Sequence, residues 1–111
     1  MVRAPESLRW LILLRDTLTL AHALRERGRE AFNSDPLLQL SAESLVMRTG
    51  DLAKKLMASD EELAKLSLLQ KAARARDFVA HHYHRIDSDQ LWRTISESLI
   101  ELERWLDDSA P

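Results

Sequence analysis

Apolar residues recur every three or four positions along most of the chain, the spacing that places side chains on one face of an α-helix. The pattern predicts a first helix over about residues 6–32, with Pro5 in an early helical position. Its expected apolar face consists of Leu8, Leu11, Leu14, Leu18, Ala21 and Leu24. Residues 33–36 interrupt the pattern, with Asp35 as the expected N-cap and Pro36 as the first residue of the next helix.

The second predicted helix covers about residues 36–57 and contains a glycine within its apolar pattern. Its expected apolar face consists of Leu38, Ala42, Leu45, Leu52 and Leu56. A glycine inside a helix costs about 1 kcal/mol relative to alanine, so Gly50 indicates a place where another helix packs closely. Ser59 and Glu62 have the spacing of a capping box, which predicts the start of a third helix at Ser59.

The third helix is expected to end or bend between Tyr83 and Ile86, because Asp87 then supplies a new N-cap. A last helix follows, with Leu91, Ile95, Leu99, Leu102 and Leu106 on its apolar face and residues 107–111 as a frayed tail. Trp92 and Trp105 are expected to pack, whereas Trp10 fits either the core or an interface between chains. Helices joined by short turns predict an all-α, antiparallel bundle of four to five helices, in a single domain over residues 1–111.

Composition narrows the class of protein. The 111 residues include no cysteine, which excludes disulfides and thiolate metal sites. No apolar stretch approaches the roughly 18 to 20 residues that span a bilayer, so a soluble cytoplasmic protein without a membrane partner is expected. The net charge of −2 argues against a protein that coats nucleic acid non-specifically.

A local basic cluster nevertheless lies between residues 71 and 85 of this weakly acidic chain. It contains Lys71, Arg74, Arg76 and Arg85 against the single Asp77, together with His81, His82 and His84. A solvated helix face is one interpretation of this cluster. Attraction of nucleic-acid phosphates is the other, and it makes RNA-binding candidates of Lys71, Arg74, His82, His84 and Arg85.

On an ideal helix, Arg76 and Tyr83 would share one face, while Asp77, His81 and His84 would share another. Arg76 and His81 would lie about 140° apart around the axis. These two residues could therefore serve one site only if the helix bends, if it ends there, or if two chains meet there.

Two chemistries fit these residues. Asp77, His81 and His84 could ligate a metal ion, although no other motif supports this. Arginine and histidine also suit metal-free RNA cleavage, in which the 2′-OH is the nucleophile: histidine transfers protons near neutral pH, and the guanidinium holds phosphate oxygens. This second chemistry requires no cofactor.

The segment from Arg76 to Tyr83 has the form Arg-Asp-x-x-x-His-x-Tyr, which resembles the signature of HEPN-domain proteins and, more narrowly, of HepT-like toxins. The following Ile86-Asp87 and Leu91-Trp92 pairs extend the resemblance, as does the upstream segment around Gly50. Asp77 departs from that group, which usually has asparagine there.

The resemblance implies a homodimeric HEPN bundle that acts as the endoribonuclease toxin of a prokaryotic type VII toxin–antitoxin pair. Arg76 would stabilise the scissile phosphate, His81 would be the principal catalytic residue, and Asp77 would support the active site between the two chains. Tyr83 matches the tyrosine that a nucleotidyltransferase antitoxin of the MntA type adenylylates to silence the toxin. The alternatives are a catalytically inactive HEPN module that binds a nucleotidyltransferase, and a purely structural helical bundle.

Overall fold

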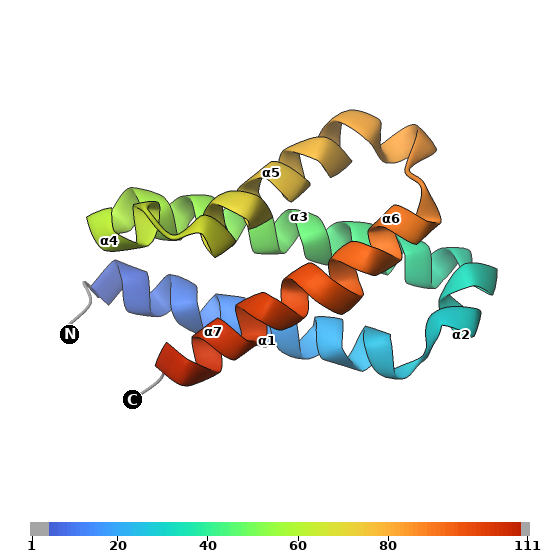
Figure 1. The fold of residues 1–111 in the computed structure, drawn as a ribbon, viewed down its shortest axis with the longest axis horizontal. Coiled ribbons are helices and arrows are strands. Elements are labelled where there is room, and N and C mark those ends of the chain that lie inside the picture. The colour runs from blue at the N-terminus through green and yellow to red at the C-terminus, as the bar shows by residue number, and fades with distance from the viewer. Residues whose placement is uncertain (1–4, 110–111) are drawn as a thin grey trace.

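The structure is a computed structural model that describes residues 5–109, and it is helical along nearly all of this range (Figure 1). In chain order, the elements are α1 (Pro5–Glu26), α2 (Arg29–Ser34), α3 (Pro36–Ser59), α4 (Glu61–Ala64), α5 (Ser67–His82), the 3₁₀ turn η1 (Tyr83–Arg85), α6 (Ser88–Arg93), the π-helical segment η2 (Thr94–Ser98) and α7 (Leu99–Ser109). No helix within residues 5–109 is long and apolar enough to cross a membrane.

Helix α3 lies at the centre of the bundle, with α1 and α5 packed along it and α7 crossing in front of α1 (Figure 1). The predicted all-α bundle is therefore confirmed. The largest fully buried side chains come from every long helix, from α2 and from η2, and include Leu14, Leu18, Phe32, Leu56, Leu69, Ile95 and Leu102. Trp10, Trp92 and Trp105 are partly buried and pack against this core.

The first predicted helix is two helices. Helix α1 ends at Glu26, and Gly28 adopts a φ of +87°, a left-handed conformation that favours glycine and stops the helix before α2 begins. Phe32 of α2 then packs on Trp92, with 5.1 Å between ring centroids. The apolar face was also predicted too broadly, since Leu8 is 49% exposed.

The third predicted helix is also divided, and its capping box is wrong. Asp60, not Ser59, is the N-cap, and its carboxylate accepts hydrogen bonds from the amides of Glu62 and Leu63. The Ser59 hydroxyl instead donates to the Leu56 carbonyl at 3.0 Å. Helix α4 ends at Ala64, and α5 begins at Ser67.

The last predicted helix contains a π-helical segment, in which the amide of Leu99 donates to the carbonyl of Thr94. Asp87 is its N-cap, as predicted, and accepts from the amide of Asp89 at 2.9 Å. Residues 107–109 continue α7 and are not a frayed tail; residues 110–111 of the predicted tail lie outside the described part.

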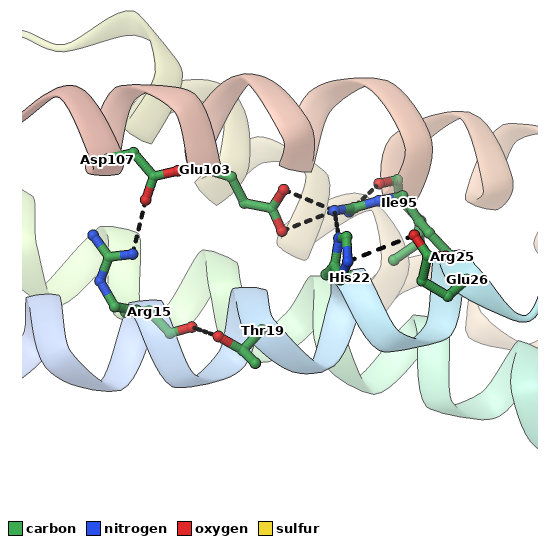
Figure 2. Close-up of polar contacts among 8 residues, drawn as sticks. All are labelled: Arg15, Thr19, His22, Arg25, Glu26, Ile95, Glu103 and Asp107. Carbon is green, nitrogen blue, oxygen red and sulfur yellow. Dashed lines mark hydrogen bonds and ion pairs between the residues drawn. The ribbon is translucent and has the colours of Figure 1, made fainter.

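Hydrogen bonds and ion pairs connect α1 to η2 and α7 (Figure 2). The guanidinium of Arg25 donates to both carboxylate oxygens of Glu103 at 2.8 and 2.7 Å, and to the carbonyl of Ile95 at 3.0 Å. Ile95 belongs to the π-helical segment, where backbone hydrogen bonding is irregular. Arg15 pairs with Asp107 at 2.8 Å nearer the end of α7. These contacts hold the C-terminal helix in register with α1.

Candidate active site

Helix α5 carries Arg76, Asp77 and His81 within one uninterrupted α-helix that ends at His82. The predicted end of this helix is therefore confirmed, but no bend separates Arg76 from His81. Regular helical geometry places the two side chains about 140° apart around the axis. Tyr83 and His84 lie in the following 3₁₀ turn, so His84 does not continue the helix face of Asp77 and His81.

Gly50 of α3 provides the space in which Arg76 sits. A β-carbon added at Gly50 would lie 2.1 Å from the β-carbon of Arg76 and 2.7 Å from the carbonyl oxygen of Ala72. Atoms this close would overlap, so only glycine allows α5 to approach α3 here. The close packing predicted from this glycine is confirmed, and it determines the position of Arg76.

Two carboxylates contact the guanidinium of Arg76, which is 28% exposed. Its Nε donates to Oδ1 of Asp51 at 2.8 Å, and its Nη1 donates to Oδ1 of Asp77 at 3.4 Å. Asp51 follows Gly50 on α3, so the same turn of α3 both admits and orients the arginine. Asp77 therefore lies directly beside Arg76, and its supporting role in the active site stays a prediction.

Asp77 has a second cationic partner that the sequence analysis missed. Nζ of Lys54, on α3, donates to Oδ1 of Asp77 at 2.6 Å. The hydrogen bond from Lys54 is the main reason that the pKa of Asp77 lies below its usual value, and the charge of Arg76 lowers the pKa further. Asp77 is therefore a carboxylate at neutral pH.

His81 is exposed and held by its own helix. Its Nδ1 lies 2.6 Å from the carbonyl oxygen of Asp77, an atom that only accepts hydrogen bonds, so the proton is on Nδ1. In the neutral ring, Nε2 is then the basic nitrogen, and among residues 5–109 it forms no hydrogen bond or ion pair. Nδ1 of His82 likewise lies 2.8 Å from the carbonyl oxygen of Phe78. The rings of His82 and Phe78 stack, with 4.3 Å between their centroids.

The remaining RNA-binding candidates lie on α5 before Arg76 and in the 3₁₀ turn η1 that follows α5. Tyr83 is 68% exposed and meets His84 edge to face, with 5.7 Å between ring centroids. Nε of Arg85 donates to Nε2 of His84 at 3.2 Å. On the preceding turns of α5, Lys71 and Arg74 are exposed and line a cavity of about 230 Å³ between α3, α5 and the C-terminal helix.

Among the described residues, no three histidine, aspartate or glutamate side chains come together as a possible metal site, and this includes Asp77, His81 and His84. The groups that the fold does assemble are Arg76, Asp51, Asp77 and Lys54. The sequence contained one signal for the α3 contribution: Asp51 and Lys54 are three residues apart, and therefore on one helix face, beside the glycine that indicated close packing.

In a comparison with protein families, residues 13–108 match the family described as ribonuclease HepT-like. No curated protein and no solved structure matches the chain. The match covers the whole of α3, α5 and the motif from Arg76 to Tyr83, and the all-helical fold is consistent with a HEPN bundle. The chain therefore belongs to the ribonuclease HepT-like family.

Proposed function

We propose that this protein is a metal-independent endoribonuclease, the toxin of a type VII toxin–antitoxin pair, with its active site formed between two copies of the chain. Ribonuclease activity is the activity of its family. The observation that carries the proposal is the placement of Arg76 and His81 on one uninterrupted helix, each held in a defined orientation.

The chemistry requires a proton acceptor and a cation at the phosphate. The 2′-oxygen of RNA bonds to the adjacent phosphorus, and the bond from phosphorus to the 5′-oxygen breaks. A base takes the proton of the 2′-OH, and an acid donates a proton to the leaving 5′-oxygen. His81 has its Nε2 available for proton transfer. The Nη atoms of Arg76 would stabilise the charge that grows on the phosphate oxygens.

Two chains explain how these residues could act on one phosphate. With about 140° between Arg76 and His81 on one helix, the Arg76 of one copy would meet the His81 of the other. Large apolar side chains also remain exposed on α1 and α3, where a second copy could cover them: Ile12 is 63% exposed, Leu20 53% and Leu40 61%.

The ribonuclease proposal is tested with total RNA in EDTA. The wild type should cleave it, and His81→Ala should not. His22→Ala is the control, because His22 is also an exposed histidine but lies on α1 beside Glu26, 3.5 Å away. Absence of cleavage by the wild type, or equal cleavage by His81→Ala, would refute the proposal.

Mixing two inactive variants tests the shared site. A hybrid dimer of Arg76→Ala and His81→Ala contains one intact pair, so random mixing should restore about a quarter of the wild-type activity if each site takes Arg76 from one chain and His81 from the other. If both residues must come from the same chain, the mixture stays inactive. Sedimentation of the wild type measures whether the dimer exists.

Tyr83 is proposed as the point of control. Its exposed side chain lies two positions after the proposed catalytic histidine in sequence and directly after α5. Adenylylation by an MntA-type nucleotidyltransferase would add bulk and negative charge beside the basic residues and so exclude RNA. Mass spectrometry after co-expression should find AMP on the wild type and none on Tyr83→Phe; an unmodified wild type would contradict this.

One observation favours a second candidate, a catalytically inactive module that binds a nucleotidyltransferase. The carboxylates of Asp51 and Asp77 both contact Arg76 and could occupy the donors that a phosphate needs. Stable co-purification with the nucleotidyltransferase, together with no RNA cleavage, would support this alternative. Growth arrest that depends on both Arg76 and His81 would refute it.

A further inference from the structure

Three residues from one turn of α3 lie against Arg76 and Asp77, and each makes a different contact. Gly50 leaves space for the β-carbon of Arg76, Asp51 contacts its guanidinium, and Lys54 contacts the neighbouring carboxylate. The positions 50, 51 and 54 lie within one turn of helix, so all three can face α5. The proposed catalytic arginine is therefore oriented from a different helix than the one that carries it.

The two carboxylates engage different parts of the Arg76 guanidinium. A guanidinium has five N–H donors, one on Nε and two on each Nη. Asp51 accepts from Nε at 2.8 Å, which fixes the plane of the group. The contact from Nη1 to Asp77 is longer, at 3.4 Å, and weaker. The Nη groups, the part that would hold phosphate oxygens, are thus only loosely engaged.

Lys54 competes with Arg76 for the same oxygen. Oδ1 of Asp77 lies 2.6 Å from Nζ of Lys54 and 3.4 Å from Nη1 of Arg76. The hydrogen bond from Lys54 is also the largest cause of the lowered pKa of Asp77. If Lys54 were removed, the uncompensated carboxylate would be drawn to the nearest remaining cation, which is the Nη1 of Arg76.

We propose that Lys54 is a positioning residue of the ribonuclease site, which holds the Asp77 carboxylate so that the Nη groups of Arg76 stay available to phosphate. The inference rests on the proposed ribonuclease function. Lys54 also supplies a positive charge that balances the Asp77 carboxylate next to the proposed catalytic arginine.

The test is a double-mutant cycle on RNA cleavage with Lys54→Met and Asp77→Asn. Lys54→Met alone should lower kcat/KM between about tenfold and a hundredfold, because a displaced catalytic group costs that much. Asp77→Asn serves as the reference background for the cycle: there the change of Lys54 should lower kcat/KM no further, so the double variant should match Asp77→Asn. Lys55→Met is the matched control, since Lys55 is the adjacent lysine but lies over the ring of Trp10, 4.8 Å from its centroid.

Either of two cleavage results would overturn the proposal. If Lys54→Met lowers kcat/KM equally in the wild type and in Asp77→Asn, Lys54 contacts RNA directly. If Lys54→Met leaves kcat/KM unchanged, Lys54 has no role in the site.

The side-chain Nε–H signal of Arg76 in ¹H–¹⁵N spectra provides a readout without RNA. This signal should shift in Lys54→Met. In the double variant it should lie close to its position in Asp77→Asn. An unmoved signal refutes the coupling even if the protein cleaves no RNA, so the two failures can be told apart.

Discussion

Replacement of Gly50 by alanine should both destabilise the protein and displace its proposed catalytic arginine. The new β-carbon would lie 2.1 Å from that of Arg76 and 2.7 Å from a backbone oxygen of α5, so the two helices must separate by roughly 1 Å. Overpacking of this kind costs about 1 to 3 kcal/mol. The upper end is expected because neither colliding atom is the end of a flexible side chain.

Alanine also has a higher helix propensity than glycine, which offsets about 1 kcal/mol of this cost. The net loss in the free energy of unfolding is therefore about 2 kcal/mol, which lowers Tm by roughly 8 °C for a domain of this size. Urea denaturation at constant m-value measures it. RNA cleavage at a temperature where the variant is folded should fall by up to about a hundredfold, because Arg76 moves with α5.

Gly28→Ala is the matched control, since Gly28 is the other of the two glycines in the chain. A β-carbon at Gly28 would have no atom within 4 Å, but its φ of +87° strains any other residue. The expected cost is about 1 to 2 kcal/mol without an effect on cleavage by the folded protein. Equal or greater stability of Gly50→Ala relative to the wild type would refute the reasoning, as would cleavage at the wild-type rate.

Three further predictions concern stability and use urea or thermal denaturation. Arg25→Met should cost about 2 to 3 kcal/mol because Glu103 loses its cation in a largely buried pair; a cost below about 1 kcal/mol would contradict this. Burial raises the pKa of Glu43 above 4.5, so the folded state disfavours its charge, and stability falls as pH rises through that range. Glu43→Gln should remove this fall and be more stable at neutral pH. Asp87→Ala should cost about 1 kcal/mol through the lost N-cap of α6.

Asp77 has the opposite linkage, which Asp77→Asn tests. Its folded-state pKa is lowered, mainly by the hydrogen bond from Lys54, so its contribution to stability is present above the ordinary value of 3.8. That contribution is lost as pH falls through the lowered pKa. The free energy of unfolding should therefore decrease less steeply with falling pH in Asp77→Asn than in the wild type. An unchanged decrease would show that the pairing of Asp77 with Lys54 adds nothing to stability.

The periodicity of apolar residues predicted the long helices because burial on one face dominates their formation. It did not predict the breaks near Gly28 and Leu66, where the apolar spacing continues through the change of direction. Ser59 was taken for a cap because residue type alone cannot distinguish it from Asp60, the neighbour that does cap α4. Such choices depend on where the flanking helices pack, which is a tertiary property.

The motif on α5 could be read from the sequence, but which residues of α3 contact it could not. Arg76 and His81 stand out through their local spacing. Their partners are set by the register in which α3 crosses α5, and Asp51 is 25 positions from Arg76 along the chain. Gly50 indicated that two helices meet closely, without indicating which residue of the other helix enters the space. Only the crossing register selects Asp51 and Lys54 as neighbours of the motif.

Arg76 and His81 are therefore oriented by separate means, and this separation has a consequence for catalysis. The guanidinium is fixed across the α3–α5 contact, whereas the imidazole is fixed by a carbonyl one turn earlier on α5. Neither contact has to form during the reaction, so both groups can be in place before RNA binds, which is the condition for electrostatic stabilisation at low cost. Changes in α3 should consequently impair phosphate stabilisation and leave proton transfer by His81 intact, so the cleavage that remains in Lys54→Met should still be abolished by His81→Ala.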